Sequence, residues 1–317
     1  MKATAIRSDT IPQYNNAHYA VVDLGSNSFH LLIVHLTDNT IKTVSKVKRK
    51  VRLAAGLNNQ NELSQEAIER GLDCLALFAQ PLASIPKENI RIVATAALRI
   101  ANNRSLFIHA ANKILPVNIN LLSGEQEANT IYSGVAHTCH DNSTQKRLVV
   151  DIGGASTELI IGEGFNALHA ISLNLGCVSF NERYFSDNKL TTNNFDNAIN
   201  AANKIIQPIA SRFVKLGWQT ALGSSGTMKA LIEVLHSHQQ ETVLNMNFLQ
   251  KIKQELIAFK SIDNIFFDGL RADRVAVLAS GLCILMALFN CLQIKELKLS
   301  TGALREGLLF ELLALQN

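Results

Sequence analysis

The chain has 317 residues, enough for two domains that each bury a core of their own. Its composition, with 47% hydrophobic and 18% charged residues, is that of an ordinary globular protein. The 30 basic and 26 acidic residues leave a net charge of only +4, and aromatic residues make up 6%. We therefore expect no nucleic-acid partner, because neither a strong basic surface nor an aromatic stacking surface is indicated.

Cysteine usage and the distribution of apolar residues predict a cytoplasmic protein. The five cysteines are odd in number and lack a Cys-x-x-Cys spacing, which favours reduced thiols over a disulfide framework. Residues 1–18 have no apolar core that would mark a secretory signal. Residues 275–294 are apolar enough to span a bilayer, but Ser280, Asn290 and Gln293 interrupt them. A buried helix is the better interpretation, so we expect no membrane segment.

The first half of the chain alternates short apolar runs with amphipathic stretches. Two serines predict helix starts: Ser64 as an N-cap, and Ser123 in a capping box with Gln126. In chain order the predicted elements are strands at 19–23 and 29–34, a basic strand-like stretch at 41–53, a helix at 64–80, strands at 90–94 and 117–122, and a helix from 123 to about 136.

A polar stretch at 137–146 is the predicted boundary between the halves. The elements predicted after it are a strand at 147–151, helices at 193–216, 226–238, 247–260 and 271–291, a strand at 296–300 and a final helix. Alternating strands and helices indicate an α/β fold in both halves. We predict one domain at 16–136 and a second at 147–317, with the last helix a candidate to pack back on the first.

An internal repeat links the two halves. Residues 21–33 and 149–161 align with aspartate, glycine and serine at equal offsets, and apolar runs flank both turns. One copy would mean little, because Asp-x-Gly turns join many hairpins. Two copies, each near the start of a half-chain, indicate a duplicated strand–turn–strand unit.

Glycine-rich turns of this kind suit phosphate, since glycine lets an oxygen approach the backbone amides and serine adds a hydroxyl donor. A third turn, at 223–227, follows an apolar strand and begins a helix, which is either an anion site or simply a capped helix start. Neither a Walker A loop nor a dinucleotide-binding fingerprint is present. The candidate phosphate ligands from these turns are Gly25, Ser26, Asn27, Ser28, Gly153, Gly154, Ser156, Ser225, Gly226 and Thr227.

Four motifs, at 23–30, 151–158, 223–227 and 302–307, resemble those of the exopolyphosphatase / guanosine pentaphosphate phosphohydrolase family. The resemblance extends over about residues 18–311. It implies an α/β fold of two actin-like (ribonuclease H-like) lobes with the active site in the cleft between them, and it allows a homodimer. Residues 49–58 and 93–99, together with Ala155, are closer to the guanosine pentaphosphate branch. Long members of the family continue into a helical C-terminal region.

The resemblance also implies roles for particular residues. The family's Ser-Gly-x-x-Glu-Ala motif places the catalytic base at Glu127; without it, Glu127 would read as a favourable charge near a helix N-terminus. Asp151 and Glu158, with Asp23 as a third candidate, are expected to hold Mg²⁺ or another divalent cation. Arg99 and Thr157 join the phosphate ligands on the same basis.

The basic run at 41–52 has two interpretations. Its six cations could compensate a polyphosphorylated substrate, or its lysines could protect an exposed edge strand.

The expected reaction is release of the terminal phosphate of guanosine pentaphosphate, giving the tetraphosphate. Inorganic polyphosphate is the alternative substrate for the same site. Two further hypotheses are a sugar or acetate kinase with actin-like lobes, and a nucleotide sensor that binds without turnover.

Overall fold

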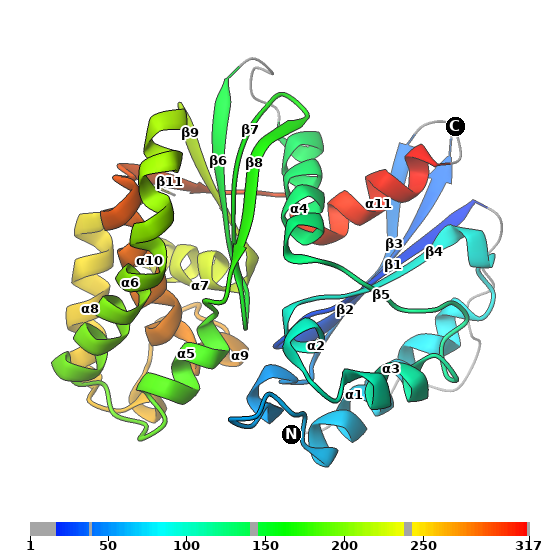
Figure 1. Ribbon diagram of the computed structural model, residues 1–317, viewed down its shortest axis with the longest axis horizontal. Helices are drawn as coiled ribbons and strands as arrows, with labels where there is room; N and C mark the ends of the chain where they lie inside the picture. The colour runs from blue at the N-terminus through cyan, green and yellow to red at the C-terminus, as the bar shows by residue number, and fades with distance from the viewer. Residues whose placement is uncertain (1–16, 38–39, 140–144, 238–242, 316–317) are drawn as a thin grey trace.

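Two β-sheets, each covered by helices, form two lobes that lie side by side (Figure 1). The structure is a computed structural model, and it describes residues 17–37, 40–139, 145–237 and 243–315. The strand orders are β3-β2-β1-β4-β5 in the first sheet and β10-β11-β9-β6-β7-β8 in the second.

The first sheet begins with three antiparallel strands, and β4 and β5 then continue it in parallel with β1. The strands are β1 (His18–Leu24), β2 (Ser28–Thr37), β3 (Thr40–Lys50), β4 (Ile90–Ala94) and β5 (Asn120–Leu121). Three helices belong to the same lobe: α1 (Gln65–Leu82), α2 (Ala96–Ile100) and α3 (Arg104–Ala111).

The second sheet repeats this arrangement. Strand β6 pairs antiparallel with β7 and parallel with β9, as β1 pairs with β2 and β4. Its strands are β6 (Lys146–Ile152), β7 (Thr157–Glu163), β8 (Asn166–Leu173), β9 (Thr220–Ser224), β10 (Val243–Asn245) and β11 (Glu296–Leu299). The sequence repeat is therefore a structural repeat, and the two-lobed actin-like fold is confirmed.

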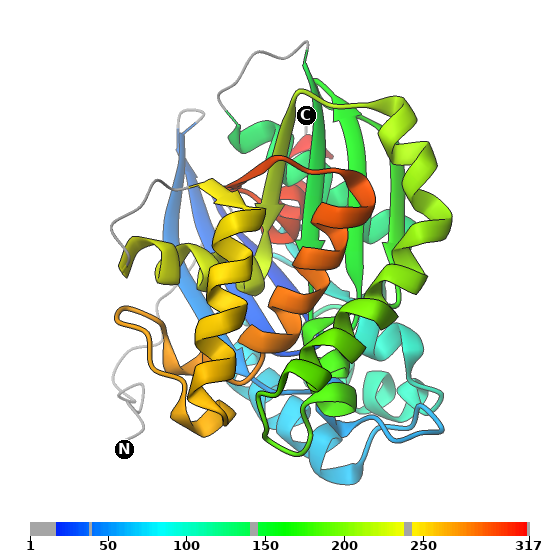
Figure 2. The same ribbon diagram turned by 90° about the vertical axis from the view of Figure 1, so that its left-hand side faces the viewer.

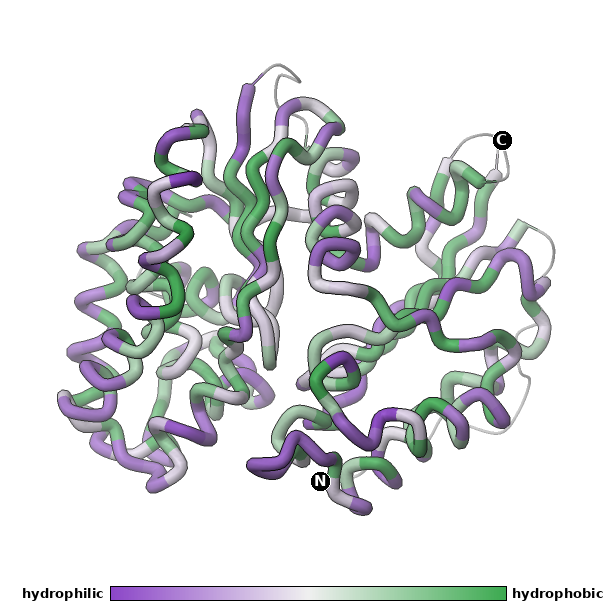
Figure 3. Tube along the Cα trace, viewed as in Figure 1, coloured by the Kyte–Doolittle hydropathy of each residue, from purple (hydrophilic) through white to green (hydrophobic). Residues whose placement is uncertain are grey.

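The helices α6, α8 and α10 lie together over one face of the second sheet (Figure 2). The helices of this lobe are α5 (Cys177–Tyr184), α6 (Thr192–Leu216), α7 (Ser225–Ser237), α8 (Met246–Phe259), α9 (Ala272–Val275) and α10 (Leu278–Leu292). Hydrophobic residues follow the inner strands of both lobes, while the outer helices carry hydrophilic stripes (Figure 3). Strands β1 and β6 are buried almost throughout because helices cover both faces.

The apolar segment at 275–294 is a buried helix, as predicted. Nearly every residue of α10 is buried, which explains why it is apolar on all sides. Within the described ranges, no helix combines the length and apolarity that crossing a membrane requires. The predicted single helix at 271–291 is wrong, however, because the backbone leaves the helix at Ala276 and Val277 and so separates α9 from α10.

Several short elements differ from the prediction. The expected strand at 117–122 is reduced to the two residues of β5, and the short helices α2, α3 and α5 were not predicted. Each has eight residues or fewer, too few for a helical period to show in the sequence. The N-caps at Ser64 and Ser123 are confirmed, the second with its complete capping box. Part of the polar stretch at 137–146, residues 140–144, lies outside the described residues.

Two helices lie between the sheets and join the lobes: α4 (Gly124–Thr138) and α11 (Leu304–Ala314). Helix α4 packs on β7 and β8 of the second sheet, whereas α11 packs on β1 and β4 of the first. Side chains from both helices and both sheets form one buried apolar cluster. The division at 16–136 and 147–317 therefore stays a prediction, because each helix packs on the sheet of the opposite half.

Glycines allow α4 and α11 to meet backbone to backbone. A Cβ on Gly134 would lie 2.1 Å from the Ala303 carbonyl oxygen, and one on Gly307 would lie 1.9 Å from the Thr130 carbonyl oxygen. Neither distance is sterically possible, and backbone atoms cannot move aside as a side chain tip can. The contact between the two helices therefore depends on glycine at both positions.

We expect Gly307→Ala to lower the melting temperature, because overpacking of this kind costs about 1–3 kcal/mol or more. Thermal unfolding of the purified protein measures the effect. Asn129→Ala, on the exposed face of α4, is the matched control and should leave the melting temperature unchanged or slightly raised. A Gly307→Ala protein as stable as the parent would contradict this account of the helix contact.

Candidate active site

A cavity of about 470 Å³ lies between the lobes, and residues from both line it. Thirteen of the sixteen residues predicted from the sequence line this cavity: Asp23, Gly25, Ser26, Asn27, Ser28, Glu127, Asp151, Gly153, Gly154, Ser156, Ser225, Gly226 and Thr227. Those thirteen are brought together although the chain separates Asp23 from Thr227 by most of its length. Arg99, Thr157 and Glu158 are not among the lining residues.

The two repeated turns touch each other across the cleft. A Cβ on Gly154 would lie 2.9 Å from the Ser26 Cβ and 3.2 Å from the Asn27 nitrogen, so only glycine lets the turns approach this closely. The Ser26 hydroxyl oxygen accepts a hydrogen bond from the backbone N–H of Ala97 at 3.2 Å, which ties the first turn to α2. The turns form two adjoining walls of one cavity.

The third turn adds a helix N-terminus to the same cavity. Ser225, the first residue of α7, has φ +76°, a conformation that is rare and strained for a residue other than glycine. Its hydroxyl donates to the Ile152 carbonyl at 2.7 Å and so fastens the turn to the end of β6. No atom lies within 4 Å of where a Gly226 Cβ would be, so the N-terminus of α7 faces open space. Such a helix end favours anions.

Glu127 lies in the first turn of α4 and is 6% exposed. Its Oε2 accepts a hydrogen bond from Arg99 Nη1 at 2.8 Å. Burial raises the pKa of Glu127 to about 7; Arg99 opposes this rise, and the charges of Asp23 and Asp151 add to it. A carboxyl that titrates near neutral pH beside a cavity is suited to exchanging protons with a bound ligand or water.

Arg99 belongs to a hydrogen-bond network behind Glu127. Its guanidinium donates to Glu127 and also to the Ser172 hydroxyl at 3.4 Å. Ser172 in turn donates to Glu158 Oε1 at 2.7 Å. The network joins α2, α4, β7 and β8, and it therefore crosses from one lobe to the other. In this structure the Arg99 donors are directed at protein oxygens, and its expected role as a phosphate ligand stays a prediction.

Glu158 is fully enclosed at the inner end of this network. It is 1% exposed, and burial together with the Glu127 carboxylate raises its pKa well above the usual range. Its carboxylate accepts a hydrogen bond from Ser172, and its expected role as a metal ligand stays a prediction. Thr157 is 0% exposed and its hydroxyl donates to the Leu175 carbonyl, so its expected role as a phosphate ligand also stays a prediction.

Asp23 and Asp151 occupy matching positions at the ends of β1 and β6, and both line the cavity. Asp23 Oδ2 lies 3.2 Å from His30 Nδ1, whereas Asp23 Oδ1 is buried without a hydrogen-bond partner. Asp151 accepts a hydrogen bond from the Ser224 hydroxyl. Burial raises the pKa of Asp151 to about 6. The charge of each carboxylate is thus poorly compensated by the protein.

These two carboxylates fit a hard divalent cation. Mg²⁺ is commonly bound by one or two carboxylates, with substrate phosphates and water completing its shell. The unpartnered Oδ1 of Asp23 is an oxygen available for such a role. Among the residues that the structure describes, no three His, Cys, Asp or Glu side chains form a metal-binding group on their own.

Six cations also line the cavity, and none of them is fully buried. They are Lys46, Lys48, Lys229, Arg271, Arg274 and Arg305. Lys46 and Lys48 come from the basic run, and β3 is the edge strand of its sheet, so both interpretations of the run stay open. Arg271 and Arg274 were given no role from the sequence. Arg305 stood in a quoted motif that gave it no role.

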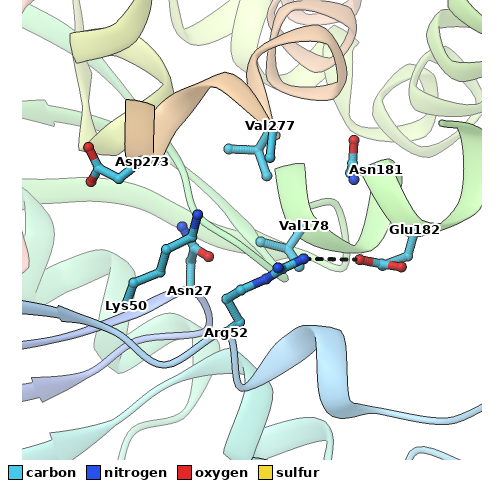
Figure 4. Close-up of a pocket in the computed structure, with 9 residues that line it drawn as sticks. Asn27, Lys50, Arg52, Val178, Asn181, Glu182, Asp273 and Val277 are labelled. Atoms are coloured by element: carbon cyan, nitrogen blue, oxygen red, sulfur yellow. Dashed lines mark ion pairs between the residues drawn. The ribbon is translucent and has the colours of Figure 1, made fainter. Parts of the chain in front are cut away.

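A smaller pocket adjoins the cavity at the mouth of the cleft. Figure 4 shows Arg52 reaching from the first lobe toward Glu182 of α5, and the pair is separated by 4.0 Å. The free volume is about 10 Å³, space for about one water molecule. This pocket lies where the two lobes meet and is too small to hold a substrate.

The fold and the cavity define a two-lobed actin-like protein with a cation-lined cleft and buried carboxylates. Its sequence matches the Ppx/GppA phosphatase family over residues 32–316. The chain belongs to that family. The recognition of the family from its four motifs is thereby confirmed.

Relatives and solved structures agree with this assignment. A protein of Aliivibrio fischeri named guanosine-5'-triphosphate,3'-diphosphate pyrophosphatase is 50% identical over 305 residues, which are 96% of this chain and 60% of that protein. One of the same name from Pseudoalteromonas translucida is 52% identical over 295 residues, 93% of this chain and 59% of that protein. This chain thus spans about 60% of the length of these relatives.

An exopolyphosphatase of Cytophaga hutchinsonii has the same fold, with a TM-score of 0.84 at 23% identity over 94% of this chain and 98% of that one. The Aquifex aeolicus member of the Ppx/GppA family gives a TM-score of 0.71 at 22% identity, over 95% of this chain and 98% of that one. Both chains are matched almost completely, so the two lobes described above correspond to the whole of each solved chain.

We expect Asp151→Asn to stabilise the protein above neutral pH. The pKa of Asp151 is raised from 3.8 to about 6, so the buried charge destabilises the fold once that carboxyl ionises. A rise of this size corresponds to about 3 kcal/mol. The gain should begin at about pH 4, reach about half of its full size near pH 5 and be complete above pH 7, as measured by thermal unfolding. Glu125→Gln, exposed on α4, should show no such pH dependence. A gain that is equal at pH 5 and pH 8 would contradict the assignment to Asp151.

Proposed function

We propose that the chain hydrolyses the terminal phosphoric anhydride bond of guanosine pentaphosphate, releasing phosphate and the tetraphosphate. The observation that carries the proposal is the position of Glu127, a buried carboxyl that lines the same cavity as the three glycine-rich turns. The names of the relatives that are about half identical to this chain support the choice of nucleotide.

In this mechanism the terminal phosphate lies against the two repeated turns and the N-terminus of α7. The Glu127 carboxylate accepts a proton from a water molecule as the water oxygen attacks phosphorus, and the bond to the bridging oxygen breaks. Arg99 holds the Glu127 carboxylate in place through its 2.8 Å hydrogen bond. The backbone amides and hydroxyls of the turns stabilise charge on the phosphoryl oxygens.

A divalent cation such as Mg²⁺ would be held by Asp23 and Asp151 together with substrate oxygens. When bound, it would neutralise charge on the phosphate chain. Glu158, named with Asp151 from the sequence, instead supports Arg99 through Ser172. Lys46, Lys229 and Arg305 would compensate the remaining substrate charge.

Inorganic polyphosphate is the second candidate substrate, and the cavity lining favours it in one respect. Among the described residues, those that line the cavity include no Phe, Tyr or Trp on which a guanine base could stack. The lining is instead rich in cations, which suits a chain of phosphates equally well.

Phosphate release from guanosine pentaphosphate and from inorganic polyphosphate, measured in parallel, tests the proposal. We expect a higher kcat/KM for the nucleotide. A higher value for polyphosphate would reverse the ranking. Calorimetric binding of the nucleotide without any phosphate release in the presence of Mg²⁺ would instead support the sensor hypothesis and overturn the proposed hydrolysis.

Glu127→Gln should lower kcat by roughly 100- to 10,000-fold, the usual contribution of general-base assistance, with little change in KM. Glu125→Gln, two residues away on the exposed side of α4, should retain parental kcat. If Glu127→Gln kept full turnover, the assignment of the base would be wrong.

The pH dependence of kcat/KM should show an acid limb near 7, because Glu127 must be ionised to accept a proton and its pKa is raised to about 7. Arg99→Gln should move this limb to higher pH, since the guanidinium lowers the pKa of Glu127 by its charge and hydrogen bond. Lys204→Gln, exposed on α6, is the control for loss of one positive charge. An unshifted limb in Arg99→Gln would show that the limb belongs to another group.

A further inference from the structure

An ion pair joins the two lobes directly across the cavity. Lys48 of β3 donates to Asp273 Oδ2 of α9 at 2.7 Å, although the two residues are 225 positions apart in the sequence. Both side chains line the cavity, and each is about one-third exposed or less. The pair therefore lies on the wall of the cavity, where solvent and ligands can reach it.

Arg271 binds the same carboxylate from the other side. Its Nε donates to Asp273 Oδ1 at 3.0 Å and its Nη2 lies 3.4 Å from Oδ2. Both oxygens of Asp273 are thus held by cations that line the cavity. Burial alone would raise the pKa of Asp273, but Lys48 and Arg271 outweigh it and lower that pKa to about 2. Asp273 is consequently an anion at any pH at which the protein would work.

The chemistry of this contact is that of a bound phosphate. An ammonium group and a guanidinium group that together grip two oxygens of one anion form the arrangement with which proteins bind phosphate. We propose that Asp273 is a specificity-determining residue, an internal competitor that occupies Lys48 and Arg271 until a polyanionic substrate displaces it. The inference rests on the proposed function, since it assumes that this cavity receives a phosphate chain.

Displacement has a consequence for specificity. A ligand with one or two negative charges gains little by replacing a carboxylate that is already well bound, whereas a ligand with several charges gains from the other cations as well. Asp273 therefore lowers the affinity of every anion that must displace it by about the same factor. A ligand that also binds the other cations keeps a useful affinity after this loss, whereas a small anion such as free phosphate does not.

The neighbouring pair provides a matched comparison. Arg52 and Glu182 also join the lobes at the mouth of the cleft, 4.0 Å apart, but neither lines the main cavity (Figure 4). If ion pairs at this mouth serve only to hold the lobes together, the two pairs should behave alike. If Asp273 competes with substrate, removal of its charge should have an effect that removal of the Glu182 charge does not.

The test uses Lys48→Ala, Asp273→Asn and Glu182→Gln. The affinity of each variant for inorganic tripolyphosphate is measured by calorimetry in a Glu127→Gln background. The KM and kcat of each variant for guanosine pentaphosphate are measured in the parental background. We expect Lys48→Ala to weaken binding roughly tenfold, through loss of a charge-assisted hydrogen bond. Asp273→Asn should tighten tripolyphosphate binding about two- to fivefold at low salt, because an exposed competitor is removed. This gain should become smaller at high salt. Glu182→Gln should leave both values unchanged.

Lys48→Ala and Asp273→Asn are expected to change the affinity for tripolyphosphate in opposite directions, and this difference is decisive. If the ion pair only held the lobes together, loss of either partner would change the affinity in the same direction. If Asp273→Asn weakens tripolyphosphate binding, or if Glu182→Gln reproduces its effect, Asp273 is not a competitor. If the parent binds tripolyphosphate and the signs are opposite, but no phosphate is released from either substrate, the competitor role holds and the proposed hydrolysis fails. A parent that binds neither tripolyphosphate nor guanosine pentaphosphate would overturn both.

Discussion

The backbone contact between α4 and α11 is the constraint on which the arrangement of the lobes depends. Gly134 and Gly307 let the two helices cross without side chains between them, and each helix packs on the sheet of the opposite half. The crossing fills the space between the sheets with one apolar cluster and fixes the first turn of α4 beside the cleft. Glu127 is buried because of this placement, and its raised pKa follows from burial.

The charges of the cleft are segregated. The carboxylates of Asp23, Asp151 and Glu127 are buried, while the lysines and arginines that line the cavity are more exposed. Asp273 is the exception, an anion that is bound by two of these more exposed cations. A phosphate chain that carries a divalent cation at one end would match this distribution. Its cation would lie near the carboxylates of the protein, and its phosphates would lie near the lysines and arginines.

The protein uses ionic contacts of two kinds. Arg99 and Ser172 connect Glu127 to Glu158 through hydrogen bonds that are largely shielded from solvent, and such a network holds a side chain in one orientation. Lys48 and Asp273 form a more exposed pair that competing anions and salt can reach. The first kind suits a residue that must not move relative to the substrate, and the second suits a contact that has to be exchanged during binding.

The sequence by itself determined the duplicated turns, the two α/β halves, the family and thirteen of the lining residues, because these depend on local patterns: alternation, caps, glycine positions and ordered motifs. It did not show that Arg99, Thr157 and Glu158 lie behind the lining of the cavity, and it gave no role to Arg271, Asp273 or Arg305. Motif membership places a residue near a site, but the direction of its side chain depends on partners such as Ser172 and Leu175 that are distant in the sequence. Only the tertiary structure decided which charges face the cavity, because the packing of α4 and α11 on the sheets of the opposite halves sets those distances and no local pattern encodes them.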